Sequence, residues 1–136
     1  MFAPLLMLLL QPQELPECDE EAAEMGVQQE MNLCAHRRFL IADRELNEQW
    51  RLTRAHMQER DANWDEFHAD SYDTRPGYFD SLLEAQRAWL TYRDAHCRTQ
   101  AYEARGGSLE PLLYASCRTA LTQARTEELR QLAQTY

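Results

Sequence analysis

The chain has 136 residues, enough for one domain with a single modest core. Its 23 acidic residues outnumber 14 basic residues, all of them arginine, and give a formal net charge of −9. This charge repels phosphate backbones and anionic lipids, so we expect no nucleic acid or membrane partner, whereas a basic protein is permitted.

Residues 1–17 have the pattern of a signal peptide or of a disordered N-terminal segment. The apolar run from Leu5 to Leu10 is too short to span a bilayer, which takes about 20 residues, but is comparable to a signal-peptide core. Basic residues after Met1 and an A-x-A site are both missing. We therefore expect a periplasmic or secreted protein with an atypical or truncated signal, no membrane span, and one helical domain over residues 18–136.

Few glycines and prolines and little β-branched content favour helices in this domain. The first long helix is predicted from Val27 to about Arg60. Its expected buried stripe recurs every three or four positions, at Met31, Ala35, Phe39, Ala42, Leu46, Trp50, Thr53 and Met57.

Residues 61–77 lose this period and end in Arg75-Pro76-Gly77, so they are predicted to form a connection, with one helical turn around 64–68. Acidic and aromatic side chains alternate there, a combination that suits a protein-binding surface. The candidate partner-binding loop consists of Asp61, Trp64, Asp65, Glu66, Phe67, Asp70, Tyr72 and Asp73.

A second helix from about Phe79 to Ala104 and a third ending near Gln134 are predicted on either side of a short turn. Gly106 suits the position after a helix, Ser108 suits an N-cap, and Pro111 falls in a first turn. Three helices in this order predict an all-α, antiparallel up-down bundle of three helices, or of four with a short extra helix.

Four cysteines in an exported chain predict two disulfides, for which the sequence allows three pairings. Cys97 and Cys117 each lie ten residues from Gly107, so a helical hairpin bending there brings them level. This leaves Cys18 to pair with Cys34. Each bridge would contribute about 3 kcal/mol by the loop-entropy estimate.

Polar residues also fall on or beside the apolar stripes of the three helices, namely Asp43, Asn47, Gln86, Arg93 and Arg125. A buried unpaired charge costs several kcal/mol, so inward arginines need an inward carboxylate. Asp43 is better placed for this role than Asp94. The pattern predicts a hydrogen-bonded network within the bundle; a pocket open to solvent is the alternative.

Catalytic and metal-binding patterns are weak. Cys34 with His36, and His96 with Cys97, point in different directions on a helix and cannot share one ion without a second helix. There is neither a G-x-S-x-G motif nor a glycine-rich phosphate loop. We therefore expect no metal, no cofactor and no enzymatic activity.

Several motifs occur in an order that resembles the lysozyme inhibitor LprI N-terminal domain family, a group of small exported bacterial helical proteins. They are QQEMNLCA at 28–35, A-D-x-x-L-N at 42–47, AQRAWLTYRDAHC at 85–97, and GGSLEPLLYASC with T-x-x-R-x-x-x-L between 106 and 129. The resemblance covers about residues 18–130. It departs from the common pattern at Val27, where a capping Thr is usual, and at Trp50, where Tyr is usual.

The resemblance implies the same helical fold and adds Thr122 to the expected network. The family's motif positions correspond to Cys34, Asp43, Asn47, Gln86, Trp89, Arg93, Cys97, Cys117, Thr122 and Arg125. These are mostly expected core positions, so they indicate a fold rather than a contact surface, and the family supplies no inhibitory residues to carry over.

Two functions are compatible with these features. The first is inhibition of a basic lysozyme through an acidic surface, as the family's name implies. The second is an interaction or structural role in the bacterial envelope with a different partner. The sequence determines neither the partner nor the oligomeric state.

Overall fold

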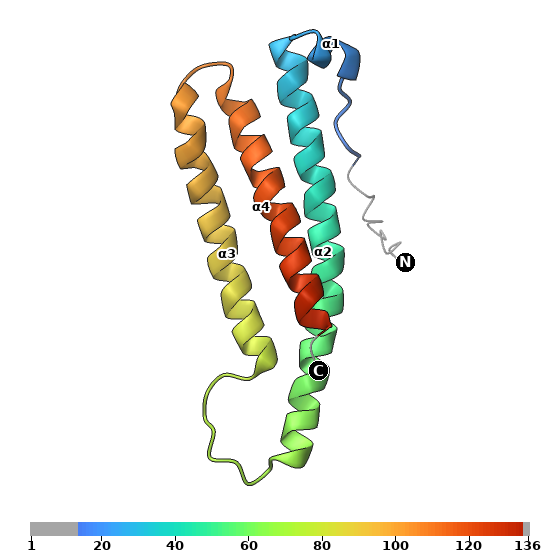
Figure 1. Ribbon diagram of the computed structural model, residues 1–136, viewed down its shortest axis with the longest axis vertical. Helices are drawn as coiled ribbons and strands as arrows, with labels where there is room; N and C mark the ends of the chain where they lie inside the picture. Colours follow the sequence, from blue (N-terminus) through green and yellow to red (C-terminus); the bar gives the residue numbers. More distant parts are fainter. Residues whose placement is uncertain (1–13, 135–136) are drawn as a thin grey trace, which may run out of the picture.

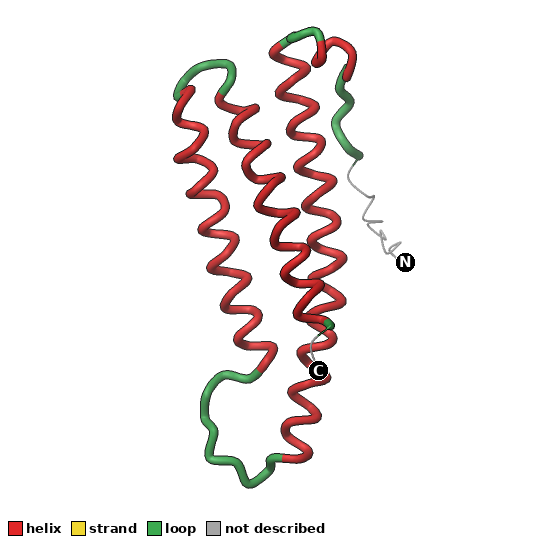
Figure 2. The backbone as a smooth tube through the Cα atoms, in the orientation of Figure 1, coloured by secondary structure: helices red, strands yellow, loops and turns green. Residues whose placement is uncertain are grey.

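The computed structural model describes residues 14–134, which form one short and three long helices and no strand (Figure 1, Figure 2). The predicted all-α class is confirmed. The helices are α1 (Glu20–Glu24), α2 (Gln28–Phe67), α3 (Tyr78–Ala101) and α4 (Glu110–Ala133), and a 3-10 turn (Tyr102–Ala104) extends α3. Most of the expected signal segment lies outside the described residues. Within them, no helix is long and apolar enough to cross a membrane.

The three long helices form the predicted antiparallel bundle, in which α3 runs against both α2 and α4 (Figure 1). In this view α4 lies between the other two helices, and it contacts both of them. The hydroxyl of Thr53 on α2 donates a 2.8 Å hydrogen bond to the carbonyl of Leu129 on α4, and Thr53 is fully buried. This bond sets the register of the two helices.

The short extra helix that the sequence allowed is α1, at the N-terminal end, and the helical turn expected around residues 64–68 is the last part of α2. Asp19 caps α1, because its carboxylate accepts a 3.0 Å hydrogen bond from the backbone N–H of Ala22. Gly26 then adopts a φ of 89°, which lets the chain turn into α2. Val27 is the N-cap of α2 and makes no side-chain capping bond. The helix nevertheless begins here, directly after the position at which the family usually has Thr.

Helix α2 is longer than predicted, because it continues through residues 61–67 to Phe67. These residues were expected to form mainly a connection. Asp61 is partly buried, and residues 62–67 are exposed. Since α4 does not extend along this part of α2 (Figure 1), these residues have no helical neighbour on that side, and the sequence there carries no apolar stripe. The connection to α3 therefore spans only residues 68–77.

The core consists of one apolar cluster and of several small side chains. Leu46, Met57, Leu82 and Leu129 form the cluster, against which partly buried Trp50, Tyr78, Phe79 and Trp89 pack. The predicted α2 stripe is confirmed as buried at Ala35, Phe39, Ala42, Leu46, Thr53 and Met57. Two leucines of the other long helices are exposed, Leu90 on α3 and Leu132 near the end of α4.

Both predicted disulfides are present, between Cys18 and Cys34 and between Cys97 and Cys117. Gly106, with a φ of 79°, turns the chain between α3 and α4 as predicted. Ser108 is not the N-cap of α4, because the helix starts one residue later, after Leu109. The backbone carbonyl of Ser108 accepts a 2.9 Å hydrogen bond from Asn32, which ties the turn to α2.

The N-terminus of α3 is capped from another helix. Its N-cap residue, Gly77, has no side chain, and the carboxylate of Asp61 on α2 accepts hydrogen bonds from the backbone N–H groups of Tyr78 (2.7 Å) and Phe79 (3.0 Å). A Cβ at Gly77 would lie 2.5 Å from an oxygen of Asp61. Asp61 thus serves the fold by joining α2 to the start of α3.

We predict that Asp61→Ala lowers the free energy of unfolding by about 1–2 kcal/mol, because two helix N–H groups lose their acceptor. Asp65→Ala, one turn further along and exposed, is the matched control and should change it by less than about 0.5 kcal/mol. Urea unfolding followed by circular dichroism measures both values. Equal effects would show that the Asp61 cap contributes nothing.

Candidate functional site

Arg93 on α3 lies at the centre of the polar contacts inside the bundle, with a side chain that is 7% exposed. Its Nε donates to Asp94 at 2.9 Å, and its Nη1 donates to the hydroxyl of Thr122 on α4 at 3.3 Å. Asp43 on α2 is an ion-pair partner at 3.6 Å. Asp94, judged the poorer candidate from sequence, therefore lies closer than Asp43, and Arg93 is bonded to both carboxylates.

Arg125 on α4 is also buried, but it has weaker charge partners. Its Nε donates to the amide oxygen of Gln86 on α3 at 2.9 Å. The only carboxylate paired with it among the described residues is Glu128 at 3.5 Å, whose side chain is 59% exposed. The Nη2 atom of Arg125 is buried without a hydrogen-bond partner. Arg125 thus holds a buried charge against one neutral amide and one solvated acid.

One residue of the expected network lies outside it, and one arginine was missed. Asn47 is exposed, because it follows the buried Leu46 by one residue and so points about 100° away from it. Arg118 on α4 lies over the rings of Phe39 (3.8 Å) and Tyr114 (4.1 Å). Burial lowers the pKa of its guanidinium. Arg118 is partly buried, and its position four residues before the buried Thr122, on the same side of α4, could have indicated this.

The candidate partner-binding residues lie at the far end of the molecule, on the last two turns of α2 and the connection that follows. We call residues 61–73 the tip. Phe67 is 76% exposed and Tyr72 98% exposed. Trp64 stacks on His68, with 3.8 Å between the ring centroids. The tip therefore presents large aromatic surfaces to solvent, as binding surfaces do.

The five acids of the tip divide into two groups. Asp61 caps α3, and Asp73 pairs with Arg75 at 2.7 Å. Asp65, Glu66 and Asp70 are exposed, and none of these three forms an ion pair within residues 14–134. Their negative charge is therefore available to a partner.

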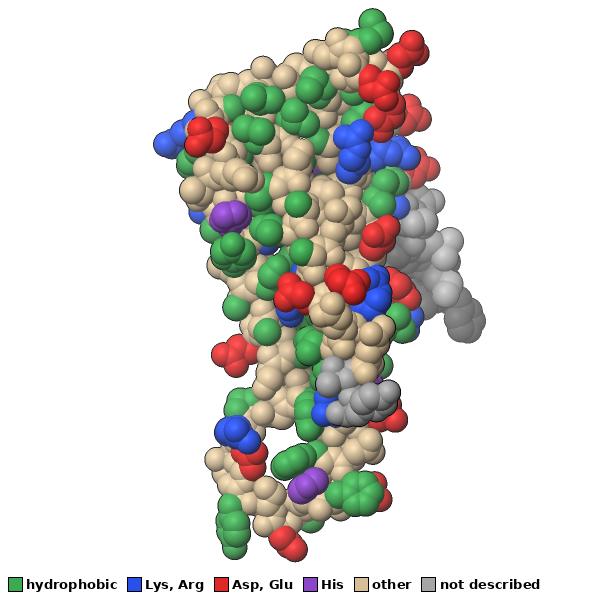
Figure 3. Space-filling view, viewed as in Figure 1, with side chains coloured by type: hydrophobic (Ala, Val, Ile, Leu, Met, Phe, Trp, Pro, Cys, Tyr) green, Lys and Arg blue, Asp and Glu red, His purple; other side chains and the backbone are tan. Residues whose placement is uncertain are grey.

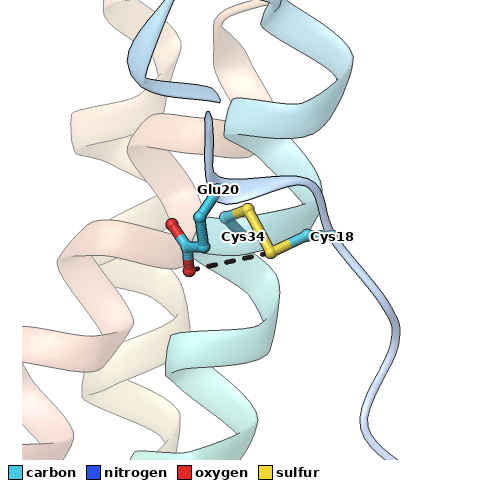
Figure 4. A group of neighbouring side chains, drawn as sticks. All are labelled: Cys18, Glu20 and Cys34. Atoms are coloured by element: carbon cyan, nitrogen blue, oxygen red, sulfur yellow. Dashed lines mark hydrogen bonds between the residues drawn. A yellow bond between two sulfur atoms is a disulfide. The ribbon is translucent and has the colours of Figure 1, made fainter. Parts of the chain in front are cut away.

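The side chains of Cys18, Glu20 and Cys34 form a cluster whose potential ligand atoms lie within 4.8 Å of one another (Figure 4). Both sulfur atoms belong to a disulfide, so neither is a thiolate that could bind a metal. The 3.8 Å contact from the Cys18 sulfur to Glu20 carries no hydrogen in this state. Glu20 is instead paired with Arg38 at 2.9 Å, and the cluster holds α1 against α2.

We predict that Arg93→Met lowers the free energy of unfolding by about 1–3 kcal/mol, because Thr122 and two acids lose a buried partner. Arg51→Met is the matched control: its side chain is 60% exposed and paired with Glu48, so the change should stay within about 0.5 kcal/mol. Thermal and urea unfolding measure the difference. A stable Arg93→Met protein that has lost a binding activity would instead make this network a binding site.

The Asp73–Arg75 pair predicts an unusual titration. Hydrogen bonds from the Arg75 side chain and backbone lower the pKa of Asp73 from 3.8 to about 2. Because the folded pKa is depressed, the stabilisation from this pair is complete above the ordinary pKa and is lost as the pH falls through about 2. NMR titration of Arg75→Gln should move the Asp73 midpoint up toward 3.8, whereas Arg130→Gln should leave it unchanged. An unmoved midpoint in Arg75→Gln would contradict this assignment.

Comparisons with known proteins agree with the resemblance in the sequence. Residues 18–129 match the family described as lysozyme inhibitor LprI. The chain is also similar to an uncharacterized protein of Rhizobium meliloti (strain 1021), with 39% identity over 139 residues that cover 96% of this chain and 93% of that protein. No solved structure matches it. With a family match over most of its length and this relative, the chain belongs to the lysozyme inhibitor LprI family.

Proposed function

We propose that this protein is a non-enzymatic inhibitor that binds a basic lysozyme through the tip. Membership of a family described as lysozyme inhibitors supports the type of partner. The observation that carries the choice of surface is that three unpaired acids and two strongly exposed aromatic side chains occur together in the tip.

The shape of the bundle supports the same surface. Thr53 is level with Leu129, and from there α2 continues for 14 residues and α4 for only four. At 1.5 Å per residue, the tip projects about 15 Å beyond α4. A projecting end can reach a recessed surface on a partner that the flat sides of the bundle cannot reach.

Charge and aromatic surface would act at different stages of binding. Asp65, Glu66 and Asp70 would speed the encounter with a basic enzyme, an effect that salt weakens. Phe67 and Tyr72 would supply the buried contact area once the complex forms. The −9 net charge of the whole chain acts in the same direction as the tip.

An envelope interaction protein with a different partner is the second candidate. One observation favours it: four residues of the family's motifs are all buried, namely Gln86, Arg93, Thr122 and Arg125. A protein that has these residues therefore has the family's fold, but it need not have the same contact surface. Both functions require export to a compartment in which disulfides form.

An inhibition assay tests the proposal. The oxidised protein, added to a basic lysozyme, should inhibit it at micromolar concentrations, and less so at moderate than at low salt. Reversing Asp65, Glu66 and Asp70 together to Lys should weaken inhibition on the order of tenfold. The matched control reverses three exposed acids at the other end of the molecule, Glu17, Glu21 and Glu24, and should have a smaller effect.

Two results would contradict this proposal. Absence of inhibition at tens of micromolar at both salt concentrations would exclude that lysozyme as the target. Equal weakening by the two triple variants would exclude the tip as the contact surface and leave only the net charge. Tyr72→Ser, compared with Tyr92→Ser on the 55% exposed Tyr92 of α3, checks the aromatic contribution separately.

A further inference from the structure

A cleft of about 920 Å³ lies beside the tip, between the end of α2, the connection, the start of α3 and the end of α4. The space-filling view shows the molecule hollowed at this end (Figure 3). The cleft exists because α4 ends before α2 does. Its volume is in the range of small-molecule sites.

The floor of the cleft is apolar. Met57 and Leu82 are each 5% exposed and belong to the core cluster, and Tyr78 and Leu132 form part of the walls. An apolar chain that replaces the water on this floor buries apolar surface, which lowers the free energy of the complex. The ligand class therefore includes an apolar segment.

Arg125 adds one charged group to this floor. It lines the cleft, is only 8% exposed, and leaves its Nη2 without a hydrogen-bond partner. Arg93, the other deeply buried arginine, is bonded to two carboxylates. Arg125 has a neutral amide and one distant, solvated acid. A buried guanidinium in this state is stabilised by an additional anionic acceptor.

The rim restricts the charge of that acceptor. Besides Arg125, four carboxylates line the cleft, Asp61, Asp65, Asp73 and Glu84, against two arginines, Arg60 and Arg75. This excess of negative charge disfavours ligands with several negative charges such as phosphates. A peptide C-terminus is disfavoured for another reason. Its amide groups lie beside the carboxylate and would be left without partners on an apolar floor.

We propose that this cleft binds an amphiphile that joins one carboxylate to an unbranched apolar chain, a medium-chain fatty acid. The carboxylate pairs with Arg125, and the chain lies along Met57, Leu82 and Leu132. The cleft shares Asp61, Trp64, Asp65 and Asp73 with the tip, but binding of this ligand does not depend on lysozyme inhibition.

Direct binding to the oxidised full-length protein tests the proposal. The probes are sodium octanoate below its micelle-forming concentration, 1-octanol as a chain without charge, and N-acetyl-leucyl-leucine as a peptide carboxylate, each followed by calorimetry and NMR. Octanoate should bind one molecule per chain, about tenfold or more tightly than octanol, because a hydrogen-bonded charge contributes that much. Equal affinity for octanol, no binding of octanoate, or tighter binding of the dipeptide would each overturn it.

Two variants locate the ligand. Arg125→Gln should reduce octanoate affinity about tenfold and leave octanol affinity unchanged. Because Arg125 is buried, a second variant at an exposed position is needed: Leu132→Asp, at a side chain 37% exposed, should also weaken octanoate about tenfold. Leu52→Asp, at a 47% exposed position that does not line the cleft, is the matched control and should bind normally. Unchanged octanoate affinity in Leu132→Asp, with the fold verified by circular dichroism, would overturn the proposed site.

Because these measurements report ligand binding alone, their outcome is separate from that of the lysozyme assay.

Discussion

The guanidinium of Arg93 is the contact on which the arrangement of the three long helices depends. It belongs to α3, donates to Thr122 on α4 and pairs with Asp43 on α2. A shift of one residue along any helix would turn a partner away by about 100° and leave a buried charge without hydrogen bonds. The register of this bundle therefore follows from a polar contact.

The need for such contacts comes from the small size of the core. Around the two disulfides the buried side chains are mostly small, and include Ala35, Ala101 and Ala115. Alanine contributes little apolar area. The covalent links thus hold the end of the bundle at which burial stabilises least, while the leucine cluster and the Arg93 contacts stabilise the remainder.

The sequence predicts those parts of the fold in which one helix faces another. The α2 stripe from Ala35 to Met57 is periodic because α4 packs along it, and the position of the α3–α4 turn determines which cysteines pair. Residues 62–67 could not be predicted as helical in this way, because an exposed helix end carries no periodic apolar stripe. The role of Asp61 is equally hidden, since its carboxylate accepts hydrogen bonds from backbone N–H groups 17 and 18 residues away.

The candidate surfaces were only partly predictable for the same reason. Composition alone indicated the acidic and aromatic residues of the tip, but not that they continue a rigid helix. The unequal lengths of α2 and α4 have two consequences at once: the end of α2 projects as the tip, and the space that α4 leaves uncovered becomes the cleft over Arg125. A longer α4 would bury the apolar floor and give Arg125 closer neighbours, but it would also remove the projecting end. The incomplete coverage of α2 is therefore the feature of this fold that makes surface available for binding.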